Sequence, residues 1–160
     1  TSQNIFLTAD NGNGKTFLLN SILNHKHMQD LKVIYIDVAL LNKEKNYFVE
    51  LSDFDLICLD NIHKTLKSIE VQIFNLINQC KNSSTNLLFA SGKHPNDLNF
   101  LPDLVSRFKA FKQYRIHSIA DDDVTECIKF VASKLKLNYS QDLTDYFSTR
   151  IKRDFLSIKR

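Results

Sequence analysis

Short runs of apolar residues alternate with segments of helical spacing along most of this chain. Such a run, bounded by polar turn residues, is typical of a strand that is buried on both faces of a sheet. The pattern predicts five strands, of which the last is the weakest: Ile5–Leu7, Val33–Asp37, Leu56–Leu59, Asn86–Ser91 and a segment within Phe111–Ile116.

Apolar residues recur at helical intervals between these predicted strands. Phe17–Leu19 and Ile22–Leu23 follow the first strand, and the spacing from Ile69 to Ile77 predicts another helix, which the turn residues Asn82–Ser84 end. Strands that alternate with crossover helices predict an α/β fold with a parallel five-stranded sheet flanked by helices. Ligands of such folds bind at the carboxyl ends of the strands.

From Asp121 onward the pattern contains helices only. We expect residues 1–118 to form the core and residues 119–160 to form a small helical appendage, which is truncated because the chain is a fragment of a longer protein. The carboxylates of Asp121–Asp123 stand just before a helical pattern, so we expect them to cap free N–H groups there rather than to bind a metal.

The segment Ala9–Thr16 fits the phosphate-binding P-loop pattern except at its first glycine, which is Ala9. It stands between a predicted strand and a predicted helix, where backbone N–H groups converge on phosphate oxygens. Lys15 would reach the outer phosphates and the Thr16 hydroxyl would ligate Mg²⁺. We therefore predict an ADP or ATP site formed by Asn11, Gly12, Asn13, Gly14, Lys15, Thr16 and Phe17.

The apolar run Leu56–Leu59 ends in a carboxylate, Asp60. Alone it could be an ordinary loop aspartate, but together with the P-loop it predicts a second Mg²⁺ ligand beside Thr16. The next residue is Asn61, whose amide is a poor proton acceptor. We expect weak ATP hydrolysis by the chain alone, or none.

Composition narrows the choice of partners. The 160 residues are 43% hydrophobic and 24% charged, which is typical of a globular protein, and the net charge of +3 is too small to indicate nucleic acid by itself. The three cysteines are odd in number and far apart, which suits reduced thiols in a cytoplasmic protein. We expect neither membrane insertion nor direct sequence-specific DNA binding. We interpret the three cysteines as structural thiols, and the spacing of the five histidines gives none of them a catalytic role.

Five segments together resemble the AAA+ ATPases of the bacterial DnaA initiator group, most closely the Hda regulators of replication initiation. The resemblance implies a P-loop NTPase core over 1–118 and a lid over 119–160. Its most specific segment is Leu101–Arg107, and Asn61, at a degenerate Walker B position, also looks more like Hda than like DnaA. The segments are the P-loop, Leu59–Ile62, Ile73–Leu76, Leu87–Pro95 and Leu101–Arg107.

The resemblance implies that Arg107 is an arginine finger that acts in trans on ATP bound to the DnaA initiator. It also implies docking on the DNA sliding clamp, through a segment that is not in this chain. The resemblance does not decide whether this chain associates with a second copy of itself. The alternatives are the AAA+ core of a DnaA-type initiator or helicase loader that acts on DNA, and a free-standing ATPase.

Two positions depart from the pattern of the family. Gly92 stands where relatives carry the acidic residue of the sensor I region, next to Ser91. Leu156 stands in the place of the sensor II arginine and cannot donate to a phosphate. Arg153 either substitutes for that arginine or is a solvated helix charge.

Overall fold

The computed structural model describes residues 3–25, 29–43, 45–137 and 140–159. Their internal contacts divide them into two compact units. One unit holds the chain up to Ala9 together with Lys15–Arg115, and the other holds Asp10–Gly14 together with the chain from Ile116 onward.

The first unit is built on a five-stranded sheet with the strand order β2-β3-β4-β1-β5. The predicted parallel sheet is confirmed, and every predicted strand is present. Parallel pairing sets Asp37 opposite Asp60 at the carboxyl ends of β2 and β3. The strands are β1 (Ile5–Ala9), β2 (Val33–Asp37), β3 (Leu56–Asp60), β4 (Asn86–Ser91) and β5 (Lys112–Ile116).

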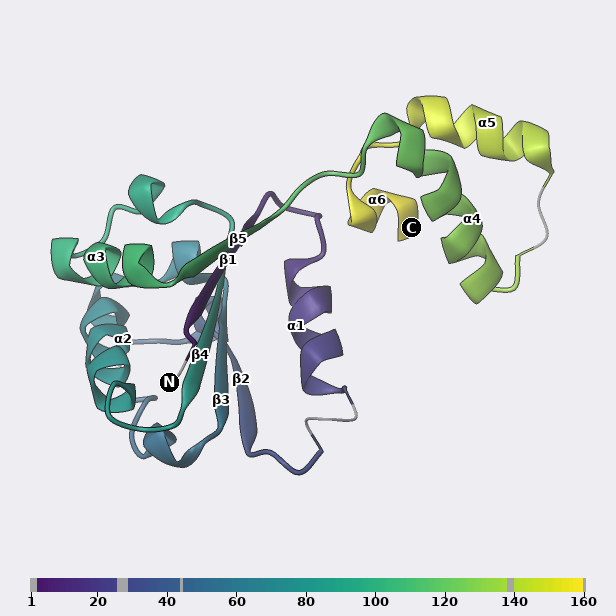
Figure 1. The fold of residues 1–160 in the computed structure, drawn as a ribbon. Coiled ribbons are helices and arrows are strands. Elements are labelled where there is room, and N and C mark those ends of the chain that lie inside the picture. Colours follow the sequence, from purple (N-terminus) through teal and green to yellow (C-terminus); the bar gives the residue numbers. More distant parts are fainter. Residues whose placement is uncertain (1–2, 26–28, 44, 138–139, 160) are drawn as a thin grey trace. The chain divides into compact units, whose positions relative to one another are not determined.

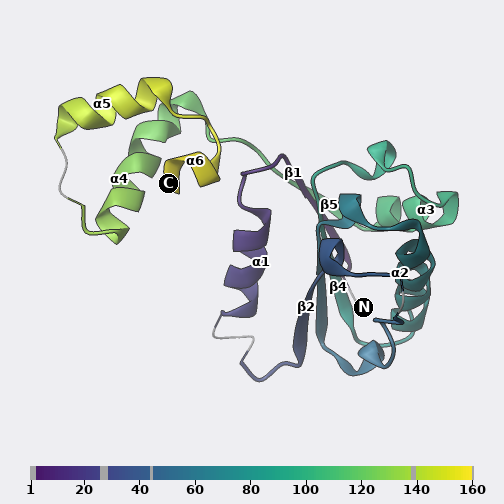
Figure 2. The same cartoon turned by 180° about the vertical axis from the view of Figure 1, so that it is seen from behind.

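Helices cover both faces of this sheet. Helix α1 (Lys15–Leu23) lies on one face, whereas α2 (Lys67–Cys80) and α3 (Pro102–Ala110) lie on the other (Figure 1). The reverse view shows the same two layers (Figure 2). Strands β3 and β4 are therefore buried on both sides, which explains why their sequences are continuous apolar runs.

An aromatic cluster fills the core between the sheet and α3. The ring centroid of Phe108 lies 5.0 Å from that of Phe6 and 5.2 Å from that of Phe89, and all three side chains are fully buried. Each such side chain contributes about 1.5–3 kcal/mol by leaving water. The cluster therefore fixes α3 against β1 and β4.

The described residues of the second unit form the helices α4 (Val124–Lys134), α5 (Gln141–Arg150) and α6 (Phe155–Lys159). Asp121–Asp123 form a single 3-10 turn, η6, before α4. The expectation that these carboxylates cap the helix is wrong in detail: Asp123 occupies the N-cap position without a side-chain capping bond, and Asp121 instead pairs with Arg153. None of the described helices combines the length and the apolarity needed to cross a membrane.

Two of the three cysteines are inaccessible. Cys58 on β3 and Cys80 at the end of α2 are buried, and burial raises the pKa of both thiols, that of Cys58 to about 12. Cys127 on α4 is partly exposed. Because the thiolate is the reactive form, the two buried thiols should be inert in the folded protein.

We predict that a maleimide at pH 7.5 labels Cys127 alone in the native protein and all three cysteines after denaturation in guanidinium. Mass spectrometry of the labelled chain measures this directly. Labelling of Cys58 at the rate of Cys127 in the native protein would contradict the burial described here.

Candidate functional site

Lys15, the predicted phosphate-binding lysine, lies at the start of α1 and close to the end of β1. Lys15 is the first residue of α1 and is only 8% exposed. Its ammonium donates to the carbonyl oxygen of Ala9, the last residue of β1, at 2.6 Å. The backbone thus holds the ammonium at the carboxyl edge of the sheet, where an anionic ligand would offer it a stronger acceptor.

The glycine-rich loop itself, Asp10–Gly14, belongs to the second unit by its contacts. Gly12 and Gly14 have φ angles of 90° and 83°, so the predicted need for glycine at both positions is confirmed. The Asn13 N–H donates to the carbonyl of Asp10 at 3.3 Å, and the buried Asn13 side chain donates to the Ser118 hydroxyl at 3.2 Å.

A carboxylate and a hydroxyl meet beside the start of α1. The Thr16 hydroxyl donates to Asp60 Oδ2 at 2.5 Å, and Asp60, the last residue of β3, is fully buried. Both groups are oxygen ligands of the kind that Mg²⁺ prefers. The two residues that the sequence assigned to the metal are therefore together, and they fit a magnesium ion.

Tyr35 on β2 is a third member of this group, and the sequence pattern gave no sign of it. Its hydroxyl donates to Asp60 Oδ2 at 3.0 Å. Burial raises the pKa of the phenol, and the negative charge of Asp60 raises that pKa further. Tyr35 therefore stays protonated throughout the physiological pH range, and its hydroxyl donates a hydrogen bond to Asp60. Only the pairing of β2 with β3 reveals this contact.

Asn61 also contacts a residue that the sequence analysis did not single out. Its backbone is left-handed, with φ of 59°, and its side-chain N–H₂ donates to Asp37 Oδ1 at 2.9 Å. The same carboxylate oxygen accepts from the Ala39 N–H at 3.0 Å. Asp37 at the end of β2 thus fixes the orientation of the Asn61 amide, which remains a poor proton acceptor.

Arg107 is not part of this cluster. It lies on α3, across the sheet from α1 (Figure 2). Its guanidinium carbon is 5.7 Å from the centroid of the Phe74 ring of α2, and its side chain is partly buried. Within the part of the chain that the structure describes, Arg107 forms no ion pair and no hydrogen bond through its side chain.

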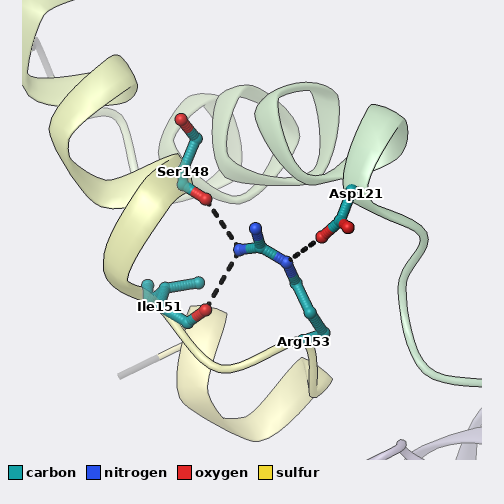
Figure 3. A network of polar contacts seen from close by, with 4 residues as sticks. All are labelled: Asp121, Ser148, Ile151 and Arg153. Carbon is teal, nitrogen blue, oxygen red and sulfur yellow. Dashed lines mark hydrogen bonds and ion pairs between the residues drawn. The ribbon is translucent and has the colours of Figure 1, made fainter.

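Arg153 is engaged inside the helical unit (Figure 3). Its Nε donates to Asp121 at 2.6 Å, and one Nη donates to the carbonyls of Ser148 and Ile151 at 2.7 and 3.1 Å. These bonds tie the segment before α6 to α5 and η6, which favours a structural role over a phosphate contact. Leu156 lies beside the glycine-rich loop, since its N–H donates to the carbonyl of Gly12 at 3.1 Å.

A family model and a named relative indicate the same family. The family model of the bacterial DnaA ATPase domain matches residues 2–113. An uncharacterized protein of Haemophilus influenzae is 29% identical over 154 residues, covering 93% of this chain and 67% of that protein. The chromosomal replication initiator protein DnaA of Mycoplasma pneumoniae is 30% identical over 152 residues, covering 82% of this chain and 34% of that protein.

A solved structure of a replication initiator DnaA bound to AMPPCP and single-stranded DNA has the same fold. It superposes with a TM-score of 0.82 at 21% identity, covering 98% of this chain and 53% of that chain. The chain thus spans about a third of the DnaA relative and about half of the solved initiator.

The two facing aspartates give a matched test of the magnesium site. We predict that Asp60→Asn lowers the affinity for MgADP at least about tenfold, because a neutral amide is a weaker ligand of a divalent cation than a carboxylate is. Asp37→Asn should change that affinity by less than about threefold, because Asp37 contacts Asn61 and not Thr16.

Isothermal titration calorimetry with ADP, in Mg²⁺ and in EDTA, measures both effects. The wild type and Asp37→Asn should lose affinity in EDTA, whereas Asp60→Asn should show little difference between the two conditions. An Asp60→Asn protein that depends on Mg²⁺ as strongly as the wild type would remove Asp60 from the metal site.

Proposed function

Because this chain belongs to the family of bacterial DnaA ATPase domains, we propose that it is a nucleotide-binding regulator that promotes hydrolysis of ATP bound to a DnaA initiator. Its fold is that of a DnaA-like AAA+ P-loop domain, linked to replication initiation. In this proposal the chain holds ADP or ATP with Mg²⁺ and presents Arg107 to the nucleotide of its partner. It acts in the cytoplasm, where the initiator works.

Nucleotide binding is supported by the carboxyl edge of the sheet. Lys15 provides a buried positive charge there, and Thr16 with Asp60 provides oxygen ligands 2.5 Å apart. The related initiator structure carries AMPPCP, a nucleotide analogue. A lysine on the outer phosphates and a metal that bridges them are the parts by which P-loop proteins hold ATP.

Asn61 supports a regulator rather than an independent ATPase. A carboxylate at this position could accept the proton of an attacking water, whereas the Asn61 amide cannot. Its N–H₂ is already committed to Asp37. The chain's own site is therefore better suited to holding a nucleotide than to hydrolysing it.

The observation that carries the proposal is the state of Arg107. Its guanidinium stacks on Phe74, and no carboxylate pairs with it in the described structure. Stacking limits the motion of the side chain without neutralising its charge. A planar cation prepared in this way suits the stabilisation of charge that develops on a phosphoryl group of another subunit.

A second candidate is the ATPase core of an initiator or helicase loader that acts on DNA. The observation that favours it is the likeness to an initiator structure that contains single-stranded DNA. Fluorescence anisotropy with a labelled single-stranded oligonucleotide separates the two. DNA binding that requires ATP would favour the initiator core, and its absence at low salt would favour the regulator.

We predict that the purified chain alone hydrolyses saturating MgATP more slowly than about 0.01 per second, because its site lacks a proton acceptor after Asp60. The measurement is release of radiolabelled phosphate with MgATP in large excess over the protein. Asn61→Asp, which restores a carboxylate, should raise the rate. Turnover of the wild type near the 1–10³ per second typical of enzymes would contradict the regulator interpretation.

We predict that Arg107→Ala removes most of the stimulation of ATP hydrolysis by a DnaA initiator, about a hundredfold or more, because an arginine finger typically contributes 10³–10⁵ in rate. Arg107→Lys should rescue little, since an ammonium lacks the two-pronged geometry of a guanidinium. The assay follows radiolabelled ATP prebound to the initiator, with the full-length regulator and clamp-loaded DNA.

Lys109→Ala is the matched control, because Lys109 is an exposed cation on the same helix. It should stimulate like the wild type. Thermal unfolding and ADP affinity should be nearly unchanged in Arg107→Ala, since only the contact with Phe74 is lost, about 0.5–1 kcal/mol. Equal stimulation by Arg107→Ala and the wild type would make Arg107 an ordinary surface residue.

A further inference from the structure

A histidine joins the ends of two central strands. His63 lies in the 3-10 turn η4 (Ile62–Lys64), three residues after Asp60 at the end of β3. Its Nδ1 accepts a hydrogen bond of 2.8 Å from the N–H of Gly92, the residue that follows β4. The imidazole therefore bridges β3 and β4 at the carboxyl edge of the sheet, the edge that also carries Asp60.

The imidazole occupies the space that a side chain at position 92 would need. A Cβ built on Gly92 would lie 2.9 Å from Nε2 of His63 and 3.0 Å from Cε1, which is closer than such atoms approach. The φ angle of Gly92 is not in the left-handed region, so space and not backbone conformation requires glycine there. The side chain that lies against Gly92 at this edge is thus that of His63, from η4.

The hydrogen bond from Gly92 also determines which nitrogen atom of the His63 ring carries the proton. Since Nδ1 is the acceptor, the neutral imidazole carries its proton on Nε2. Among the described residues, Nε2 has no hydrogen-bond partner. Burial lowers the pKa of His63, and the nearby charges of Lys64, Lys15 and Lys93 lower it further, while Asp60 opposes them. His63 is therefore a neutral donor at physiological pH.

We propose that His63 contacts the terminal phosphate of a bound nucleoside triphosphate through Nε2–H. This inference rests on the proposed nucleotide site. His63 lies beside the strand end that bears the metal-binding Asp60 and within the electrostatic reach of Lys15, which are the groups that surround the outer phosphates in P-loop proteins. A diphosphate lacks the oxygen that His63 would reach, so His63 distinguishes ATP from ADP.

Two substitutions separate the two nitrogen atoms of the ring. His63→Asn keeps an acceptor near the position of Nδ1 and loses the donor at Nε2, whereas His63→Gln keeps a donor near Nε2 and loses the acceptor for Gly92. Calorimetry measures the affinity of each variant for MgADP and for Mg²⁺ with AMPPCP. We expect His63→Asn to bind AMPPCP about tenfold more weakly and ADP within about twofold of the wild type. His63→Gln should bind AMPPCP within about threefold.

Gly92→Ala offers an independent test, because its methyl group collides with Nε2 and displaces the ring. It should reproduce the selective loss of AMPPCP affinity. His94→Asn is the matched control: His94 also accepts a backbone N–H through Nδ1, from Asn96 at 3.2 Å, but it is exposed at the N-cap position of η5 (Pro95–Asp97). It should bind both nucleotides like the wild type.

Wild-type affinity of His63→Asn for AMPPCP would overturn the inference. A parallel loss of both nucleotides in His63→Asn and His63→Gln, with a lowered melting temperature, would also overturn it, because it would assign His63 a purely structural role. Failure of the proposed nucleotide site is distinguishable, since the wild type would then bind neither ligand, or Lys15→Ala would bind both as well as the wild type does.

Discussion

The site depends on one buried charge, the carboxylate of Asp60 at the end of β3. An ion so fully removed from water is tolerated only when its oxygens are hydrogen-bonded. Asp60 receives donors from three parts of the core: the Thr16 hydroxyl of α1, the Tyr35 hydroxyl of β2, and the N–H of Asn61. These bonds set the position of α1 and β2 relative to β3, and they leave a carboxylate oxygen and a hydroxyl oxygen side by side, as ligands for a divalent cation.

Packing on the face of the sheet that carries α2 and α3 determines the position of Arg107, the candidate arginine finger. Phe108 is locked between Phe6 and Phe89, so the neighbouring Arg107 is held at a fixed point on α3. The side chain then lies over Phe74 of α2 instead of an acidic residue. An aromatic face orients a guanidinium while leaving its donors unused, which suits a residue that is to act on a second molecule.

The helical unit has its own internal order. Arg153 joins the segment before α6 to α5 and to η6 through three hydrogen bonds, and the Leu156 N–H donates to the carbonyl of Gly12 in the glycine-rich loop. The loop residues are thus bound to the segment in which the resemblance placed the sensor II position. The residue at that position, Leu156, donates a backbone hydrogen bond to the loop, and its side chain is apolar and uncharged.

The sequence alone determined the α/β architecture, because parallel strands that are buried on both faces consist of continuous apolar runs. It also showed the P-loop, whose Gly12 and Gly14 adopt positive φ angles that favour glycine. It also identified Lys15, Thr16 and Asp60, whose residue types fit the chemistry at recognisable spacing. Only the tertiary structure revealed Tyr35, Asp37 and His63. Their contacts arise from the lateral pairing of β2 with β3 and of β3 with β4, between residues distant in the chain, and no local periodicity encodes which strands become neighbours. The capping expectation for Asp121 failed for the same reason, since its partner Arg153 lies 32 residues away in the chain.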